Sequence, residues 1–517
     1  MIVFIVYTFI ILFWIYRNGF FGVLKDDVLN AKFFLSAFIV KLCGLAAFYF
    51  VYMKLYGRVD YSDTAHYFHD SKVIQSVAYW DFSEFLKLMF GLQDDSADTE
   101  LFRKFLKYTS VWDEDREELL YNDNRLMLRF NALIHFISFN SYYVHALISC
   151  LLSFIGITYI YKTFKYLFKG KEIYLMAVWL LFPGLWFWSA GLFKEGPALF
   201  CMGMLLFYLK KVIGEKEYNI FNFVKLGILI VLSLSFKQYV TIPLLVFSLV
   251  YFLVYYKLPT LKHKSLMYIG ILIVLGGAGS FVLKNSFSKS VPEVLAERQR
   301  LFLDMSNGGI FLLDSVKFVR LPYDTNLIVR TRYVDSQEKY ATMKSGAKYM
   351  YWEHTHQQDT LYCSNNTDTV TEYREYYTVP KANATLPVKQ LEGTYLSLIK
   401  ATPLLLYYTI GKPFFFDARN MMDLMASGEN LLIALALLIL IVGAYRNRGN
   451  GSSLVYFLGM LFFILIVIGI TSPNIGAIQR YRVLVIPFLF MCALQAANVK
   501  DVFLLNKIFK RMDNLSR

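Results

Sequence analysis

Cysteine, proline and charged residues are scarce in this chain. Of its 517 residues, 5 are cysteine, 12 are proline and 18% are charged. Cys43, Cys150, Cys201 and Cys492 fall in apolar segments, while Cys363 lies in a long polar segment. This distribution predicts no disulfide framework. The CxxC spacings of structural zinc sites are also absent from the sequence.

The chain is rich in apolar residues and poor in charged ones. Hydrophobic residues make up 56% of the chain and aromatic residues 18%, and the mean hydropathy is +0.43. These values exclude an ordinary soluble domain and predict an all-α, polytopic integral membrane protein. Because a membrane span needs about 17 to 25 apolar residues, we expect about eleven transmembrane helices. They lie near 1–16, 31–56, 141–161, 173–192, 196–210, 220–236, 239–256, 265–283, 429–445, 453–471 and 483–498.

Linkers rich in glycine and serine, repeats of fixed period and low-complexity tracts are absent as well. One membrane domain with two polar elaborations is the simplest organisation that follows. The first apolar segment lacks a charged lead and a cleavage site, so we expect a retained helix. The predicted parts are N-terminal helices at 1–56, a first outer loop with amphipathic helices at 57–140, a bundle at 141–283, a large outer loop at 284–428, C-terminal helices at 429–498 and a basic tail at 499–517.

Lysine and arginine alternate between the short loops, and this alternation predicts the orientation. The net charge of +14 is therefore an orientation signal and gives no reason to expect a nucleic-acid partner. We expect a multi-pass protein of the bacterial inner (cytoplasmic) membrane, with the N-terminus outside and the C-terminus in the cytoplasm. The basic, cytoplasmic loops are those with Arg17 and Lys25, Lys162 to Lys171, Lys210 to Lys216, Lys257 to Lys264, Arg446 and Arg448, and the tail.

Five unusual polar motifs all fall on the opposite, outer boundary. Their common side predicts one outward-facing site at the membrane surface. The alternative is that non-basic polar residues collect in outer loops simply because basic residues stay on the inner side. The motifs are YGRVDYSDTAHYFHD at 56–70, SAGLFKEGP at 189–197, SFKQY at 235–239, GKPFFFDARN at 411–420 and SPNIGAIQRYR at 472–482.

The first motif carries carboxylates that suit a general base. On a helix, Asp63, His66, Tyr67 and Asp70 share one face. A carboxylate such as Asp60 or Asp63, near cations and partly desolvated, can accept a proton from a substrate hydroxyl. His66 can tune that carboxylate or help to bind a divalent cation. The alternative is a solvated first turn in which Asp63 caps the helix.

The later motifs supply cations that suit a phosphate or diphosphate. Arginine binds phosphate oxygens with two parallel hydrogen bonds and stays charged. Because Arg480 and Arg482 are two residues apart, they point differently on a helix. Both arginines are candidates to bind the leaving diphosphate; we favour Arg480, and Arg482 is either a second phosphate ligand or lies at the lipid headgroups. Lys194 and Lys237 are further candidates to bind the donor phosphate, with Lys412 and Arg419 as supporting cations. Glu195 is either the partner that holds Lys194 in place or a second carboxylate at the donor site.

Three features together resemble a known superfamily. They are an acidic first outer loop after an early helix, the unit FWSAGLFKEG, and a late RYR before the helix VLVIPFLF. These features look like the GT-C glycosyltransferases and the Wzy-type polysaccharide polymerases. The resemblance implies a GT-C-like fold, a polyprenyl-phosphate or polyprenyl-diphosphate sugar donor, Asp60 or Asp63 as catalytic base, and Arg480 near the donor phosphate. This chain departs from the simplest pattern because one helix precedes the helix that carries the acidic loop.

The expected function is therefore transfer of a sugar from a lipid-linked donor to a glycan, lipid or protein acceptor on the outer face. A Wzy-type polymerase of O-antigen or exopolysaccharide, a lipid-linked sugar transporter, and a non-enzymatic partner in an envelope complex remain alternatives. Membrane helix centres are nearly bare of charge apart from Lys41, which disfavours a transporter. The glycines Gly270, Gly276, Gly277 and Gly279 predict close approach of neighbouring helices.

Overall fold

The computed structural model describes most of the chain and divides it into two compact units. One unit holds Met1–Gly279, Ile410–Val467 and Gln479–Arg517, and the other holds Ser280–Thr409 and Ile468–Ile478. The described residues are 2–17, 22–55, 63–93, 99–109, 112, 123–258, 263–307, 309–313, 317–321, 328–333, 339–343, 348–353, 358–362, 375–379, 385–446 and 451–497. The predicted basic tail at 499–517 lies outside them.

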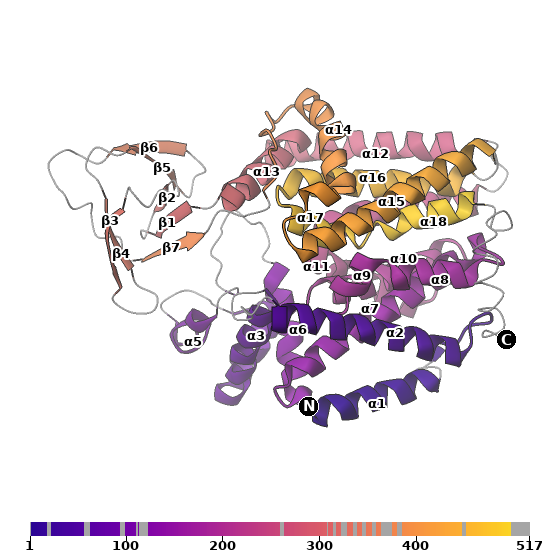
Figure 1. Ribbon diagram of the computed structural model, residues 1–517, viewed down its shortest axis with the longest axis horizontal. Coiled ribbons are helices and arrows are strands. Elements are labelled where there is room, and N and C mark those ends of the chain that lie inside the picture. Colours follow the sequence, from indigo (N-terminus) through magenta and orange to yellow (C-terminus); the bar gives the residue numbers. More distant parts are fainter. Residues whose placement is uncertain are drawn as a thin grey trace. The chain divides into compact units, whose positions relative to one another are not determined.

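The chain begins with two apolar helices that lie side by side (Figure 1), α1 (Ile2–Tyr16) and α2 (Ala31–Tyr49). The side chain of Asn30 accepts a hydrogen bond from the amide of Phe33, which caps the start of α2. A short π-helix, Phe50–Leu55, extends α2 toward the first polar motif.

The segment predicted to be the first outer loop contains helices in its described part, as its amphipathic pattern predicts. It contains α3 (Asp63–Trp80), α4 (Phe82–Phe90), α5 (Glu100–Lys104), a 3-10 turn at Leu106–Tyr108 and α6 (Asp123–Ser138). Helices α3 and α6 pack against each other. Asp81 caps α4, and Gly91 ends it in the left-handed conformation that favours glycine.

Two helices with glycine at their contact form the centre of the first unit. They are α7 (Tyr142–Phe164, followed by the 3-10 turn Lys165–Leu167) and α10 (Glu195–Ile213). A Cβ added to Gly203 would lie 2.1 Å from the carbonyl oxygen of Gly156, so the two backbones touch there. Between them in sequence, the predicted span 173–192 is broken into α8 (Glu172–Leu181) and α9 (Pro183–Trp188).

Helix α11 (Ile220–Phe252, extended by the π-helix Leu253–Lys257) turns back on itself at Lys237, whose φ of −153° and ψ of 85° are not helical. A straight helix of this length would extend about 57 Å. Instead, Lys257 at its end donates a 2.8 Å hydrogen bond to the hydroxyl of Tyr218, just before its start. Its two halves therefore correspond to the predicted segments 220–236 and 239–256. Helix α12 (Lys264–Phe287) follows.

The second unit contains β-strands that the sequence analysis does not predict. After α13 (Val291–Asn307) come β1 (Gly309–Leu313), β2 (Lys317–Leu321), β3 (Ile328–Tyr333), β4 (Lys339–Met343), β5 (Lys348–Glu353), β6 (Gln358–Tyr362) and β7 (Glu375–Val379). Five of them form an antiparallel sheet in the order β6-β5-β2-β1-β7, and β3 pairs with β4. The predicted helical architecture thus holds for the membrane part, while the large loop at 284–428 has a β-rich section.

The C-terminal part returns to helices. They are α14 (Tyr395–Gly411), a 3-10 turn at Phe415–Asp417, α15 (Met421–Arg446), α16 (Gly451–Thr471), α17 (Ile475–Arg482) and α18 (Pro487–Ala496). Helix α15 lies beside α18, and the chain bends by 55° between α17 and α18 (Figure 1). This bend places the RYR motif just before a buried helix.

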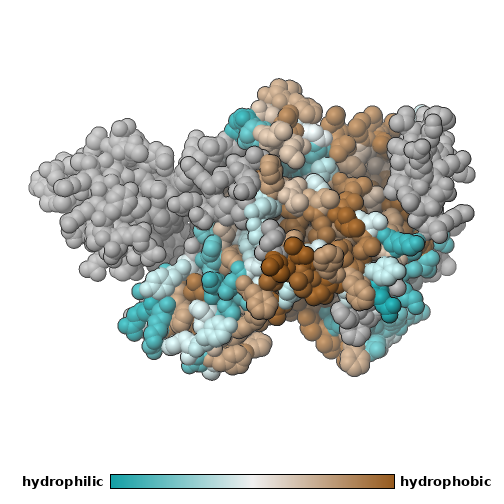
Figure 2. All heavy atoms as spheres, turned by 60° about the horizontal axis from the view of Figure 1, so that its bottom comes forward, coloured by the Kyte–Doolittle hydropathy of each residue, from teal (hydrophilic) through white to brown (hydrophobic). Residues whose placement is uncertain are grey.

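Seven helices in the described parts are long and apolar enough to span a membrane, or eight if α17 and α18 make one bent span. An α-helical membrane protein is therefore confirmed in outline, although the number eleven is not. Two predicted spans correspond to the shorter apolar helices α1 and α8, and two more are joined in α11. Large apolar side chains cover much of the outer surface, as the brown areas of Figure 2 show.

Candidate functional site

Asp63 stands at the first turn of α3, where helix N-termini favour a negative charge. Its carboxylate is 55% exposed, and on the same helix Tyr67 and Asp70 are buried and His66 is half-buried. The predicted helix through this motif is therefore present. Asp60, the other predicted base, lies outside the described residues.

Glu195 is the first residue of α10 and is completely buried. Its Oε1 accepts hydrogen bonds from Lys237 Nζ at 2.8 Å and from Arg480 Nε at 3.0 Å. Its Oε2 accepts none from the described part of the chain. Two cations therefore compensate for the hydration that this carboxylate loses on burial.

Lys237 reaches Glu195 from the bend of α11. Lys237 itself has the non-helical backbone conformation at this bend, so its side chain can leave the direction of the helix axis. Its ammonium also donates to the Tyr239 hydroxyl at 3.1 Å and lies 4.4 Å from the ring centroid of Tyr481. A buried lysine is thus held by one carboxylate and aromatic faces.

Arg480 joins the two carboxylates. Its Nη1 contacts Asp63 Oδ2 at 2.5 Å, while its Nε contacts Glu195. The guanidinium lies 4.1 Å from the ring centroid of Phe193 and its side chain is 14% exposed. Since guanidinium binds carboxylates and phosphates with the same donors, a phosphate can take the place of a carboxylate here.

Lys194 completes the group. It is buried, and its ammonium lies 5.8 Å from the ring centroid of Tyr67 on α3. Partial burial of Asp63 opposes its ionisation, but the charges of Arg480 and Lys194 outweigh that effect and hold the pKa of this carboxyl below its usual value. Asp63 is therefore ionised at neutral pH.

We call Asp63, Lys194, Glu195, Lys237 and Arg480 the Arg480 cluster. Three cations meet two carboxylates, so the cluster carries a net positive charge. Glu195 and Lys237 form its buried floor, and Asp63 is its most exposed member. An anion approaching from the side of Asp63 meets a preorganised, partly desolvated positive site. Five predicted site residues thus come together from α3, α10, α11 and α17.

Arg482 is not positioned for either predicted role, as a ligand of the donor phosphate beside Arg480 or as a contact to the lipid headgroups. The side chain is completely buried, and its Nη2 donates to Glu429 at 2.8 Å, Asn430 at 2.5 Å and Gln479 at 2.7 Å. Asn430 in turn donates to the carbonyls of Gly411 and Pro413. Two residues along α17 from Arg480, Arg482 therefore faces the protein interior and ties the 411–413 turn to α15.

Two predicted accessory cations lie in local ion pairs. Arg419 pairs with Asp423 at 3.5 Å and is half exposed. Lys412 pairs with Asp417 at 2.7 Å. Lys412 belongs to the 411–413 turn that the Arg482 network holds, whereas Arg419 precedes α15 and pairs with a residue in its first turn.

Two buried polar groups make contacts that the sequence did not indicate. Lys41 donates to Ser189 Oγ at 2.6 Å and to the carbonyls of Leu185 and Trp186, so it neutralises the C-terminal end of α9. The rings of His135 and His145 lie 4.3 Å apart. They contact Ser71, Asn131, Ser138 and Asn140. His135 lies on α6 and His145 on α7, and the chain reverses direction between the two helices. The ten-residue spacing in the sequence therefore did not predict that the two rings meet.

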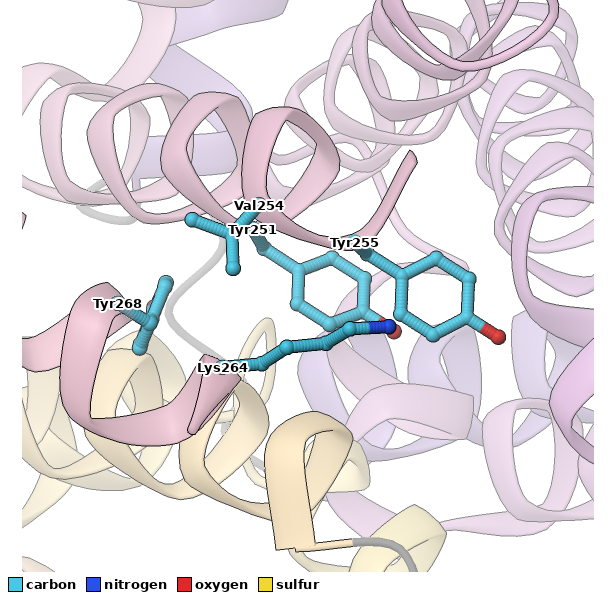
Figure 3. Close-up of a pocket in the computed structure, with 5 residues that line it drawn as sticks. All are labelled: Tyr251, Val254, Tyr255, Lys264 and Tyr268. Atoms are coloured by element: carbon cyan, nitrogen blue, oxygen red, sulfur yellow. The ribbon is translucent and has the colours of Figure 1, made fainter. Parts of the chain in front are cut away.

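The described residues contain no group of three or more His, Cys, Asp and Glu side chains that could hold a metal ion. A small cavity of about 10 Å³ lies elsewhere, between Tyr251, Tyr255, Lys264 and Tyr268 (Figure 3). Its size suits one water molecule, and its residues belong to the ends of α11 and α12 that carry the basic loops.

No family model, curated protein or solved structure matches this chain.

Proposed function

We propose that this protein is a membrane glycosyltransferase of the bacterial inner membrane. It transfers a sugar from a polyprenyl-phosphate or polyprenyl-diphosphate donor to a glycan, lipid or protein acceptor on the extracytoplasmic face. The convergence of the Arg480 cluster carries this proposal. Asp63 and Arg480 are 417 residues apart in the sequence and make a direct ion pair, and ionisable groups gathered in this way in a membrane protein favour a functional site.

Charge and burial define the role of each residue. Arg480 and Lys194 bind the donor phosphate, and Glu195 keeps Arg480 and Lys237 fixed before the donor arrives. Such preorganised charges stabilise the leaving phosphate without costly rearrangement. Glu195 is a positioning residue because it is completely buried.

The Asp63–Arg480 contact gives the reaction an order. A bound phosphate competes with Asp63 for the Arg480 guanidinium, and the released carboxylate becomes a stronger base because it loses its cation. Asp63 then accepts the proton of the acceptor hydroxyl. The hydroxyl oxygen forms a bond to the anomeric carbon as the bond from that carbon to the phosphate oxygen breaks, and the phosphate leaves with the electron pair.

A Wzy-type polymerase uses the same type of donor and transfers a whole glycan instead of one sugar, so the cluster supports it equally. A divalent cation near Asp63 and His66 also stays a prediction. Glycan length in cells that depend on this protein separates the two enzymes, because loss of a polymerase leaves single repeat units on the acceptor.

Asp63→Asn and Arg480→Gln test the enzyme function in those cells. We expect surface glycan formation to fall by about 10² to 10⁴ for the base and about 10² to 10³ for the phosphate ligand. Arg419→Gln is the matched control, since Arg419 pairs with Asp423 on the surface. Glycan and protein level are measured together. Normal glycan in both cluster variants at normal protein level would exclude this function, and lipid-linked substrate held on the cytoplasmic side would indicate a transporter.

A further inference from the structure

A charged cavity lies at the C-terminal ends of α7 and α10. Lys210, at its wall, follows Glu195 by 15 residues on the same helix, which corresponds to about 22 Å. The cavity has a volume of about 370 Å³, and four lysines line it: Lys25, Lys162, Lys165 and Lys210. They come from the α1–α2 loop, the end of α7 and the end of α10, all of which belong to the predicted cytoplasmic loops.

The walls of this cavity are held rigidly. The carboxylate of Asp26 is 1% exposed. It accepts hydrogen bonds from the amides of Val28 and Leu29 and from the Tyr161 hydroxyl, each at 3.0 Å. It also holds Lys165 at 2.8 Å. Because Asp26 is anchored on every side, Lys165 has a fixed position before any ligand arrives.

Lys162 is fixed in a different way. Its ammonium donates to the carbonyls of Val23 at 2.7 Å and Lys25 at 2.9 Å, which ties the α1–α2 loop to α7. Lys210 is 12% exposed and pairs with the more exposed Glu215 at 3.1 Å. The Lys25 side chain is exposed at the rim. The cavity therefore combines two fixed ammonium groups with two that can turn toward a ligand.

The charge balance favours an anion. Four ammonium groups face three carboxylates, and two of the carboxylates, Asp27 and Glu215, are 76% and 41% exposed. Water screens these two, so the interior of the cavity is more positive than the simple sum. A volume of this size is typical of small-ligand sites, and basic pockets between helices at the cytoplasmic face suit phosphorylated headgroups.

We propose that this cavity, the Lys25–Lys210 pocket, binds a phosphate group at the basic face of the protein, independently of the Arg480 cluster. Two sources have this chemistry: the headgroup of an anionic phospholipid and a soluble phosphate compound.

The test titrates the purified full-length protein in detergent with phosphatidylglycerol and, separately, phosphatidylcholine, and counts bound lipid by native mass spectrometry. Inorganic phosphate and glycerol 3-phosphate are added as competitors. Removal of two lysines by Lys25→Gln with Lys210→Gln is expected to weaken phosphatidylglycerol binding about twenty-five-fold, since each lysine near a membrane surface contributes a factor of about five. Lys169→Gln is the control, because Lys169 is exposed on the same basic loop and does not line the cavity.

A variant that is expected to bind more tightly distinguishes an effect on the site from an effect of misfolding. Asp27→Asn removes an exposed carboxylate that contacts Lys165, so binding should become about fivefold tighter. If the soluble phosphates compete at equal concentration, the site is a phosphate site filled from solution; if they do not, the lipid headgroup is the ligand. Equal binding by wild type and the double lysine variant, equal weakening by Lys169→Gln, or no tightening by Asp27→Asn would overturn the proposal.

Discussion

Arg480 and Arg482 are two residues apart on α17 and have opposite environments. Arg480 keeps 14% of its side chain exposed and binds carboxylates of two other segments, whereas Arg482 is completely buried beside Glu429. Residues at this spacing point to different sides of a helix. One arginine is thus available to an anion from outside, and the other is part of the core.

Loss of Arg482 should therefore destabilise the protein. Arg482→Gln leaves Glu429 buried without its cation, which typically costs about 3 to 5 kcal/mol. Adding Glu429→Gln should restore part of this loss because it removes the unpaired charge. The free energy of unfolding in mixed micelles measures both, with Arg419→Gln as a surface control expected to cost less than about 1 kcal/mol. No loss in Arg482→Gln would contradict the network.

The Asp63–Arg480 pair predicts a dependence of stability on pH. Since the folded pKa of Asp63 is lowered, its contribution is complete above the unfolded value of about 3.9 and disappears as the pH falls through the folded value. Asp63→Asn should thus reduce the stability of the protein at pH 7. It should also make the loss of stability between about pH 5 and pH 2 smaller than in the wild type. Thermal unfolding across this range tests it, and parallel curves for variant and wild type would refute it.

At this scale the sequence identified most of the residues but not their partners. The grouping of Asp63, Lys194, Glu195, Lys237 and Arg480 at one boundary could be predicted from the alternation of basic loops. Their location on the outer side stays a prediction. Which cation pairs with Glu195 could not be predicted, because that depends on the bend of α11. Glu429 escaped notice since it begins an apolar segment and looks like an ordinary boundary charge.

Helix α11 and the α7–α10 contact show how elements position the site. The bend at Lys237 brings a lysine from mid-segment to Glu195. The glycines of α7 and α10 allow these helices to touch, and α10 starts with Glu195. Both elements must hold their geometry for the Arg480 cluster to exist.

A methyl group at this contact should disturb it. Gly203→Ala places a Cβ 2.1 Å from the Gly156 carbonyl oxygen, so the helices must separate, at a cost of about 1 to 3 kcal/mol. Gly276→Ala on α12 is the matched control, because a Cβ there meets nothing within 4 Å and helix propensity improves by up to about 1 kcal/mol. The free energy of unfolding should fall in Gly203→Ala and rise in Gly276→Ala. Equal changes in the two variants would contradict the close contact of α7 and α10.

The glycines show where sequence patterns mislead at this scale. Gly270, Gly276, Gly277 and Gly279 predict a close helix contact, yet a Cβ at any of them meets nothing within 4 Å, so that prediction is wrong within the described structure. The isolated Gly156 and Gly203 make the contact instead. The strands of the large loop also had a signal, since KYMYWE and EYYTV are rich in residues that favour strands.

At the scale of the whole molecule, the basic loops predict one orientation. In a Cys363→Ser background, Phe416→Cys should react with a membrane-impermeant maleimide on intact cells, since Phe416 is 86% exposed on a predicted outer turn. Lys169→Cys should react after permeabilisation, because Lys169 lies on a predicted cytoplasmic loop. The reverse pattern would invert the orientation and move the Arg480 cluster to the cytoplasmic side.

The long sequence separation inside the Arg480 cluster has a consequence for biosynthesis. During membrane insertion, Lys237 and Glu195 are made long before Arg480, which is 285 residues after Glu195. Until α17 arrives, Asp63 has no Arg480 to bind and the buried pair lacks its second cation. The charges of the Arg480 cluster therefore come together at a late stage of synthesis, and a chain that stops before α17 exposes an incomplete polar group to quality control in the membrane.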